Sequence, residues 1–227
     1  MVDLTDWATD RPLFTLNEAD RVLDLTRGSL REHLSRLVSR GELKRIERGT
    51  YTVHDDPMIY ATHIETPSYL TLWSGLRFYD LTTQQPTRIQ VMAATPRDDL
   101  PGIEFHVSSN LFGFGKRRYR DFEVFVADAE RLLIDCLSRR GVPVSALDEL
   151  LETVDPDRCV EYARRFDRTA VTKRVGYLLE HAQGTVRDEL RVDDRNYPKL
   201  DLNGPDIGES NAKWRLQVNT DAHENRA

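Results

Sequence analysis

The clearest pattern of apolar and polar positions along the chain lies between residues 25 and 53. Four apolar residues recur at i, i+4, i+7 and i+8: Leu30, Leu34, Leu37 and Val38. This spacing is typical of one buried face of an α-helix. Thr26 stands where a helix N-cap accepts a hydrogen bond from the first turn. Gly41 stands where a helix C-terminus favours a left-handed residue. The pattern therefore predicts an amphipathic helix between Thr26 and Gly41.

The elements around this helix suggest a complete small domain. Thr15 and Glu18 have the spacing of a capping box, which predicts a helix over residues 16–25. A turn of four residues, 25–28, joins the two helices. Residues 43–46 and 50–53 read as two strands of a hairpin, and Gly49 lies in their short connection. A helix, a short turn, a second helix and a hairpin are the order of a winged helix-turn-helix domain. We predict this domain over residues 1–56.

The remaining residues, 57–227, have their own apolar patterns. The spacing predicts a helix over residues 68–79, strands over 88–94, 103–107 and 122–126, and helices over 127–139, 144–151, 156–166 and 168–183. Residues 213–218 alternate and predict a strand that returns to the sheet. The expected fold class is α+β, with a mixed α/β C-terminal domain after the winged helix-turn-helix. Within that domain we expect a helix plus sheet (57–126), a helical part (127–183) and a tail (184–227).

Positive charge is concentrated on the predicted helix and hairpin of an acidic chain. The formal net charge is −6, whereas residues 26–53 hold seven basic and three acidic residues. DNA attracts such a surface through its phosphates, and exposed arginines and short polar side chains can reach base edges in the major groove. We predict nine DNA-binding residues: Arg27, Ser29, Arg31, Ser35, Arg36, Arg40, Lys44, Arg45 and Arg48. A solvated helix face is the alternative interpretation.

No pattern in the chain predicts a catalytic, metal or cofactor site. The six histidines are scattered, and Cys136 and Cys159 lack metal-ligand spacing and are expected to be buried thiols. Asp128 and Glu130 follow a predicted strand, as the acids of a nuclease would, but Asp128 is better explained as a helix cap. The sequence has no apolar run long enough to span a membrane, and residues 1–6 do not resemble a signal peptide. We expect a cytoplasmic protein without a membrane partner.

Several motifs together resemble the AbiEi family of antitoxins, which are paired with nucleotidyltransferase-type toxins (type IV toxin–antitoxin systems). They are Arg48-Gly49-Thr50-Tyr51, residues 67–76 (PSYLTLWSGL), residues 122–135, residues 173–179 (KRVGYLL), and Tyr197 and Leu200-Asp201 with residues 214–219 (WRLQVN). The similarity covers roughly residues 12–219. One departure is Gly75, which stands where relatives usually have alanine.

The resemblance implies a winged-helix domain that represses its own promoter, and a C-terminal domain that neutralises the toxin without a stable complex. It implies no catalytic residues. A basic surface could compete with such a toxin for phosphates, and we predict an antitoxin surface of six residues: Lys116, Arg117, Arg118, Arg120, Lys173 and Arg174. A charge-protected strand edge is the simpler interpretation of residues 116–120.

Two other functions stay open at this point. The chain could be a ligand-responsive winged-helix regulator with no toxin partner, which would require an apolar pocket with a few convergent polar groups. It could also be an enzyme that uses the acids after residues 122–126. A neighbouring gene for a nucleotidyltransferase-like protein would favour the antitoxin over the ligand-responsive regulator.

Overall fold

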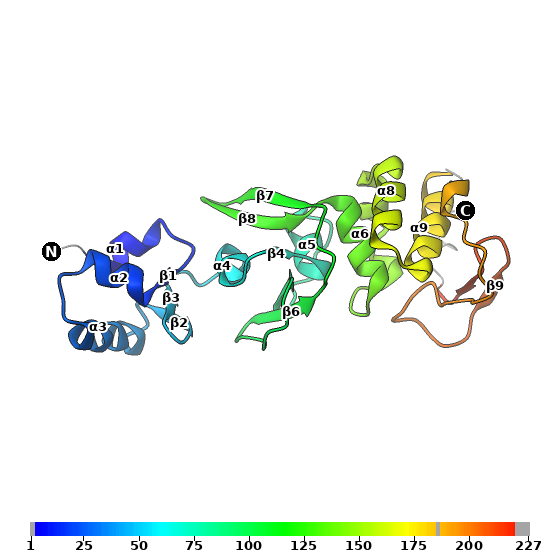
Figure 1. Ribbon diagram of the computed structural model, residues 1–227. Helices are drawn as coiled ribbons and strands as arrows, with labels where there is room; N and C mark the ends of the chain where they lie inside the picture. The colour runs from blue at the N-terminus through cyan, green and yellow to red at the C-terminus, as the bar shows by residue number, and fades with distance from the viewer. Residues whose placement is uncertain (1–2, 185–186, 221–227) are drawn as a thin grey trace. The chain divides into compact units, whose positions relative to one another are not determined.

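The computed structural model describes residues 3–184 and 187–220 as a mixture of helices and strands (Figure 1). The predicted α+β class, with several helices, is confirmed. The chain divides into two compact units. The first comprises Met1–Leu70, Pro86–Leu111 and Lys116–Phe125, and the second comprises the remaining segments. The first unit includes residues on both sides of position 56. The domain boundary expected between residues 56 and 57 stays a prediction.

The N-terminal part of the first unit is a bundle of three helices closed by a small sheet. Its elements are α1 (Leu4–Thr9), β1 (Phe14–Thr15), α2 (Leu16–Val22), α3 (Arg27–Ser39), β2 (Lys44–Glu47) and β3 (Thr50–Thr52). The strand order is β1-β3-β2, and both pairings are antiparallel. The predicted capping box forms, because Thr15 Oγ1 accepts from Glu18 N and Glu18 Oε2 accepts from Thr15 N. The core is formed by apolar residues from all three helices and β1.

The rest of the first unit is built around a five-stranded sheet. Helix α4 (Pro57–Ile64) precedes β4 (Ser68–Leu70), β5 (Ile89–Ala93), β6 (Ile103–Val107), β7 (Phe114–Tyr119) and β8 (Phe122–Ala127). The order is β6-β5-β4-β8-β7, with β5 and β6 parallel and β4 and β5 antiparallel. Asp56 caps α4 by accepting from Met58 N, with Pro57 at the first helical position. An Asp-Pro pair of this kind is a helix start signal, although residues 54–57 alone suggest only a polar turn.

The helix predicted over 68–79 is shorter than expected. Residues Ser68–Leu70 form β4, and α5 covers only Leu72–Phe78. Tyr69 and Leu70 are fully buried and pair with Met92 and Val91 of β5. A short apolar run fits a helix or a buried strand equally well, and strand pairing decides the outcome here.

The second unit is mainly helical. It contains α5, α6 (Ala129–Ser138), α7 (Asp148–Thr153), α8 (Pro156–Phe166) and α9 (Thr169–Gln183), two short 3₁₀ helices (Val144–Ala146 and Asp188–Leu190), and strands β9 (Glu209–Asn211) and β10 (Leu216–Val218). Helices α6, α8 and α9 pack against one another. Gly75 of α5 packs closely on α6, because a Cβ there would lie 2.6 Å from Leu132 Cδ1. A side chain at position 75 would therefore require Leu132 to move.

The C-terminal strand does not return to the large sheet. β10 pairs with β9 in a separate antiparallel two-stranded sheet, with Leu216 opposite Asn211. Asn211 Oδ1 accepts a hydrogen bond from Trp214 N at 2.9 Å, which closes the turn between the strands. Trp214 is 2% exposed. The alternation of residues 213–218 predicted a strand but could not identify its partner.

Candidate DNA-binding site

Helix α3 is fixed by its caps and by one buried face. Thr26 Oγ1 accepts from Ser29 N at 3.3 Å, as the sequence predicted. At the other end, Gly41 has a φ of +75°, and Glu42 N donates to Leu37 O at 3.0 Å, which is the αL termination expected of glycine. The buried face carries Leu30, Leu34 and Leu37, two of which have no exposed surface. The opposite face of α3 is therefore held toward solvent.

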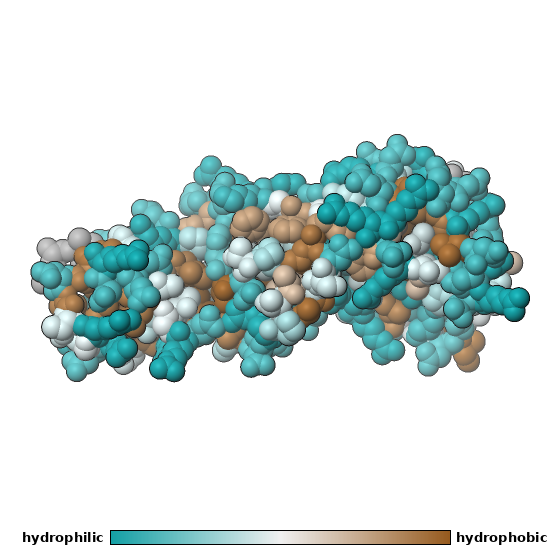
Figure 2. Space-filling view, in the orientation of Figure 1, coloured by the Kyte–Doolittle hydropathy of each residue, from teal (hydrophilic) through white to brown (hydrophobic). Residues whose placement is uncertain are grey.

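All nine residues predicted to bind DNA are exposed in the structure: Arg27, Ser29, Arg31, Ser35, Arg36, Arg40, Lys44, Arg45 and Arg48. On the face drawn in Figure 2, hydrophilic and neutral residues cover the region of α3. Within the described part of the chain, the guanidinium groups of Arg31, Arg36 and Arg48 have no hydrogen bond or ion pair. Three cations are therefore available for a ligand of negative charge.

Other members of the set have local partners. Arg27 Nη2 donates to Asn17 Oδ1 at 3.0 Å, and Arg40 Nη1 lies 3.8 Å from Glu42 Oε1. Lys44 pairs with Asp55, and its hydrogen bond lowers the pKa of that carboxyl. These contacts lie at the exposed surface, where an ion pair contributes little and is easily exchanged for a phosphate.

The hairpin of β2 and β3 is held to the same core as α3. Gly49 has a φ of +84° in its turn, a conformation that glycine adopts without strain. The Tyr51 ring stacks on the Phe14 ring at 5.8 Å, and Phe14 has no exposed surface. Thr52 is also buried, and its Oγ1 donates to Pro12 O at 2.8 Å. Lys44, Arg45 and Arg48 thus project from a fixed hairpin.

The second predicted basic cluster is only partly at the surface. Lys116, Arg117, Arg118 and Arg120 are exposed on β7, the outermost strand of the large sheet, and in the turn that follows it. Acidic groups neutralise much of this charge: Glu123 lies 2.9 Å from Lys116, Asp121 lies 3.6 Å from Arg118, and Asp56 lies 3.1 Å from Arg120. These ion pairs favour the interpretation of β7 as an edge strand whose charged side chains prevent it from pairing with another chain.

Lys173 and Arg174 do not belong to an exposed surface, contrary to the expectation from sequence. Lys173 has no exposed surface, and its Nζ donates to Asp194 Oδ1 and Asn196 O at 3.0 and 2.6 Å. Arg174 is 5% exposed and donates to Leu137 O and Lys199 O. Buried cations need such partners. Both side chains therefore fix the tail segment to α9.

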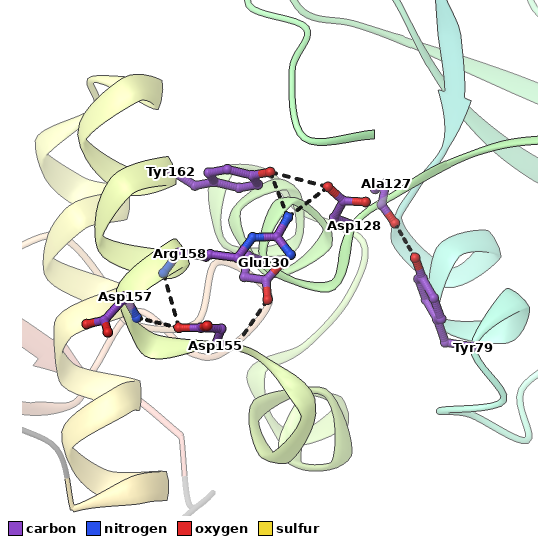
Figure 3. A network of polar contacts seen from close by, with 8 residues as sticks. All are labelled: Tyr79, Ala127, Asp128, Glu130, Asp155, Asp157, Arg158 and Tyr162. Atoms are coloured by element: carbon purple, nitrogen blue, oxygen red, sulfur yellow. Dashed lines mark hydrogen bonds and ion pairs between the residues drawn. The ribbon is translucent and has the colours of Figure 1, made fainter. Parts of the chain in front are cut away.

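The acids after β8 form an ion-pair network rather than an open site (Figure 3). Asp128 is the N-cap residue of α6 by position, but its side chain makes no capping hydrogen bond. Instead, Asp128 Oδ2 accepts from Arg158 Nη2 at 3.0 Å and from Tyr162 at 3.2 Å. Glu130 is 4% exposed, accepts from Asp155 N and lies 3.4 Å from Arg158. Both acids are thus engaged in joining α6 to α8.

Two negative findings concern the described residues. They contain no cluster of three or more histidine, cysteine or acidic side chains that could hold a metal ion. Among those same residues, no helix is long and apolar enough to cross a membrane.

One feature beside α3 has no signal in the sequence. A groove of about 940 Å³ runs between the start of α1, the end of α2 and α3. Its lining includes Ser29, His33 and Arg36 of α3, together with Leu25, which is 38% exposed at the corner between the helices. The groove depends on how three helices meet, which periodicity along one helix does not reveal.

A comparison with known protein families identifies the N-terminal part of the chain. Residues 3–54 match the model of a family described as "Transcriptional regulator, AbiEi antitoxin". The N-terminal domain matches the AbiEi family. The resemblance deduced from the motifs is thereby confirmed over the residues that contain α1, α2, α3 and the hairpin. The family is thus described both as a transcriptional regulator and as an antitoxin.

The fold is also similar to the crystal structure of the RV2827C protein from Mycobacterium tuberculosis. The TM-score is 0.63, and the alignment covers 95% of this chain and 92% of that chain at 12% sequence identity. A likeness at this identity concerns the fold alone. No curated protein matches the chain.

A prediction for the hairpin follows from its geometry. Replacing Arg48 with alanine is expected to weaken binding to operator and to unrelated DNA by the same factor, because an exposed turn residue meets phosphates rather than bases. The slope of log affinity against log salt concentration should fall by about 0.9, the value for one phosphate contact. Fluorescence titrations at several salt concentrations measure both quantities. A loss confined to the operator sequence would contradict a phosphate role.

Proposed function

We propose that this protein is a transcriptional repressor with a winged helix-turn-helix domain that binds its own promoter, and that it acts as the antitoxin of a nucleotidyltransferase-type toxin. One observation carries the proposal: the exposed basic face of α3 coincides with the residues that match the AbiEi family. A domain of this class inserts its second helix into the major groove.

The proposed mode of binding divides the nine residues by position. Those on α3 (Ser29, Arg31, Ser35 and Arg36) face the bases, where arginine can donate two hydrogen bonds to guanine. Lys44, Arg45 and Arg48 of the hairpin, with Arg27 and Arg40 near the ends of α3, contact phosphates. Repression results from occupation of the promoter.

The antitoxin role belongs in this proposal to the residues after 56. A toxin that transfers nucleotides must hold phosphates, and an exposed basic surface can compete for the same negatively charged target. Lys116, Arg117, Arg118 and Arg120 are the candidates, whereas Lys173 and Arg174 are left out because they are buried. Such competition requires no stable complex with the toxin.

A separation-of-function experiment tests the proposal. The doubly substituted full-length chain (Arg31→Ala with Arg36→Ala) is expected to lose repression of a promoter reporter and still rescue growth of cells that express the cognate toxin. The substitutions leave the buried face of α3 intact, so the protein should accumulate normally. Substituting Lys116 and Arg118 with alanine should have the opposite effect. Wild-type protein that neither binds its promoter nor rescues growth would disprove the proposed function.

A ligand-responsive regulator without a toxin partner is the second candidate, and the groove beside α3 favours it. A small molecule in that groove would contact Ser29 and Arg36, two residues proposed to contact bases, and would compete with DNA. The identity of the adjacent gene separates the two functions most directly.

A further inference from the structure

A largely buried arginine joins the β2–β3 hairpin to the large sheet of the same unit. Arg97 follows β5, and its Nη2 lies 2.7 Å from Glu47 Oε2 in β2. Its Nη1 lies 3.5 Å from Glu65 Oε2, and the guanidinium carbon lies 4.6 Å from the centre of the Phe105 ring. The Arg97 side chain is only 16% exposed. Two carboxylates and an aromatic ring therefore define its position.

The supporting side of this contact is itself ordered. Thr95 Oγ1 donates to Glu65 Oε1 at 2.8 Å, which holds the second carboxylate in place. Phe105 belongs to β6, and its backbone amide donates to Asp99 Oδ1 at 2.8 Å. Arginine is suited to such a place because its planar group binds carboxylates and stacks on rings at the same time.

Glu47 places a negative charge among the basic residues of the hairpin. It is the only acidic residue between Lys44 and Thr52, and it stands beside Arg48 in the sequence. An uncompensated carboxylate among phosphate-binding cations repels DNA. The Arg97 guanidinium neutralises this charge and also fixes the strand that carries Lys44 and Arg45.

We propose that Arg97 is a positioning residue for DNA binding, acting through Glu47 to hold the hairpin and to cancel its negative charge. The proposal rests on the proposed function, because it assumes that the hairpin meets phosphates. It extends that function to a residue outside 1–56: the sheet that follows the DNA-binding domain supports the hairpin. DNA affinity therefore depends on a side chain that does not touch DNA.

A second ion pair in the same sheet provides a matched control. Arg88 Nη1 lies 2.9 Å from Asp99 Oδ2, and neither residue contacts the hairpin among the contacts of the described chain. Loss of Arg88 removes an equal charge and a comparable pair. Any effect of Arg97 on DNA binding beyond that of Arg88 is then specific to the contacts that Arg97 makes, and the Glu47→Gln background identifies the share due to Glu47.

The experiment measures DNA binding by the full-length chain well below the melting temperature of each variant. Arg97→Ala is expected to weaken binding to promoter DNA by about 5–30-fold, which lies within the range for coupled side chains, and Arg88→Ala by less than about twofold. The decisive variant combines Arg97→Ala with Glu47→Gln. Since Arg97 acts through the Glu47 carboxylate, its removal from the Glu47→Gln protein should change the affinity by less than about twofold.

The outcomes separate this proposal from the proposed function. If the wild type binds promoter DNA and Arg48→Ala weakens it, while Arg97→Ala does not, only the positioning role is overturned. An equal loss from Arg97→Ala with and without Glu47→Gln also overturns it, because the arginine then acts through another group. If the wild type does not bind DNA, both proposals fail.

Discussion

Replacing Asp135 with alanine is expected to lower the free energy of unfolding by about 3–5 kcal/mol, which is the cost of leaving a buried charge without its partner. Asp135 and Arg131 lie one helical turn apart on α6, with side chains 1% and 0% exposed. Asp135 Oδ1 accepts from Arg131 Nε at 3.0 Å, and Oδ2 accepts from Thr71 Oγ1 at 2.9 Å. The substitution removes the carboxylate of the buried ion pair with Arg131.

The aromatic rings around Arg131 prevent its guanidinium group from reaching solvent. Its guanidinium carbon lies 4.6 Å from the centre of the Phe112 ring and 5.2 Å from that of Phe166. The same cation is packed between aromatic rings, so it cannot turn outward without disrupting the core of the second unit. Desolvation of a cation that has lost its carboxylate partner is the physical origin of the expected loss.

Chemical denaturation of the purified full-length variant measures this effect. Asp188→Ala is the matched control, since Asp188 is 75% exposed in an ion pair with Arg191 and its loss should cost less than about 1 kcal/mol. A second variant, Arg131→Met with Asp135→Leu, removes both charges and should recover most of the stability. If Asp135→Ala proves no more harmful than Asp188→Ala, the buried pair contributes nothing and this account is wrong.

The N-terminal region could be predicted well from sequence because its signals are local. The cap at Thr26, the capping box of Thr15 and Glu18, and the glycine at 41 each act within one helical turn. The apolar spacing of α3 also identified which side chains would be exposed. The nine candidates followed from this spacing together with the positive charge of the helix and the hairpin, and the structure leaves all of them at the surface.

Predictions that depended on distant partners were less successful. Residues 68–70 pair with β5 and form a strand, although their own spacing fits a helix. Lys173 and Arg174 can be buried because backbone oxygens of the tail and of α6 accept hydrogen bonds from their side chains. Two adjacent basic residues in a predicted helix do not indicate which distant backbone oxygens will bind them.

The contact between Glu47 and Arg97 is a further example. Fifty positions separate the two residues, and each stands in an ordinary polar context. Neither has a spacing or composition that indicates the other. Only the fold of the first unit brings them to 2.7 Å, so the support for the hairpin could not be recognised from the sequence.

Arg36→Ala is expected to weaken specific binding to the promoter by about 1–3 kcal/mol if this side chain reads a base, which corresponds to roughly 5–150-fold in affinity. Arg36 lies on the exposed face of α3, opposite the buried Leu34 and Leu37. Its guanidinium has no partner among the described residues, so no internal interaction is lost on substitution. The melting temperature should therefore stay close to that of the wild type.

Two comparisons make the result specific. Arg164 is exposed on α8, and Arg164→Ala removes the same charge from a helix of the second unit without an expected effect on DNA binding. Binding to unrelated DNA separates base recognition from phosphate contact, because a base-reading residue affects the operator more strongly. We expect Arg36→Ala to reduce the ratio of specific to non-specific affinity, whereas Arg48→Ala leaves that ratio unchanged. An unchanged operator affinity together with a lowered melting temperature would show instead that Arg36 stabilises α3, and the assignment of this helix face to base recognition would have to be abandoned.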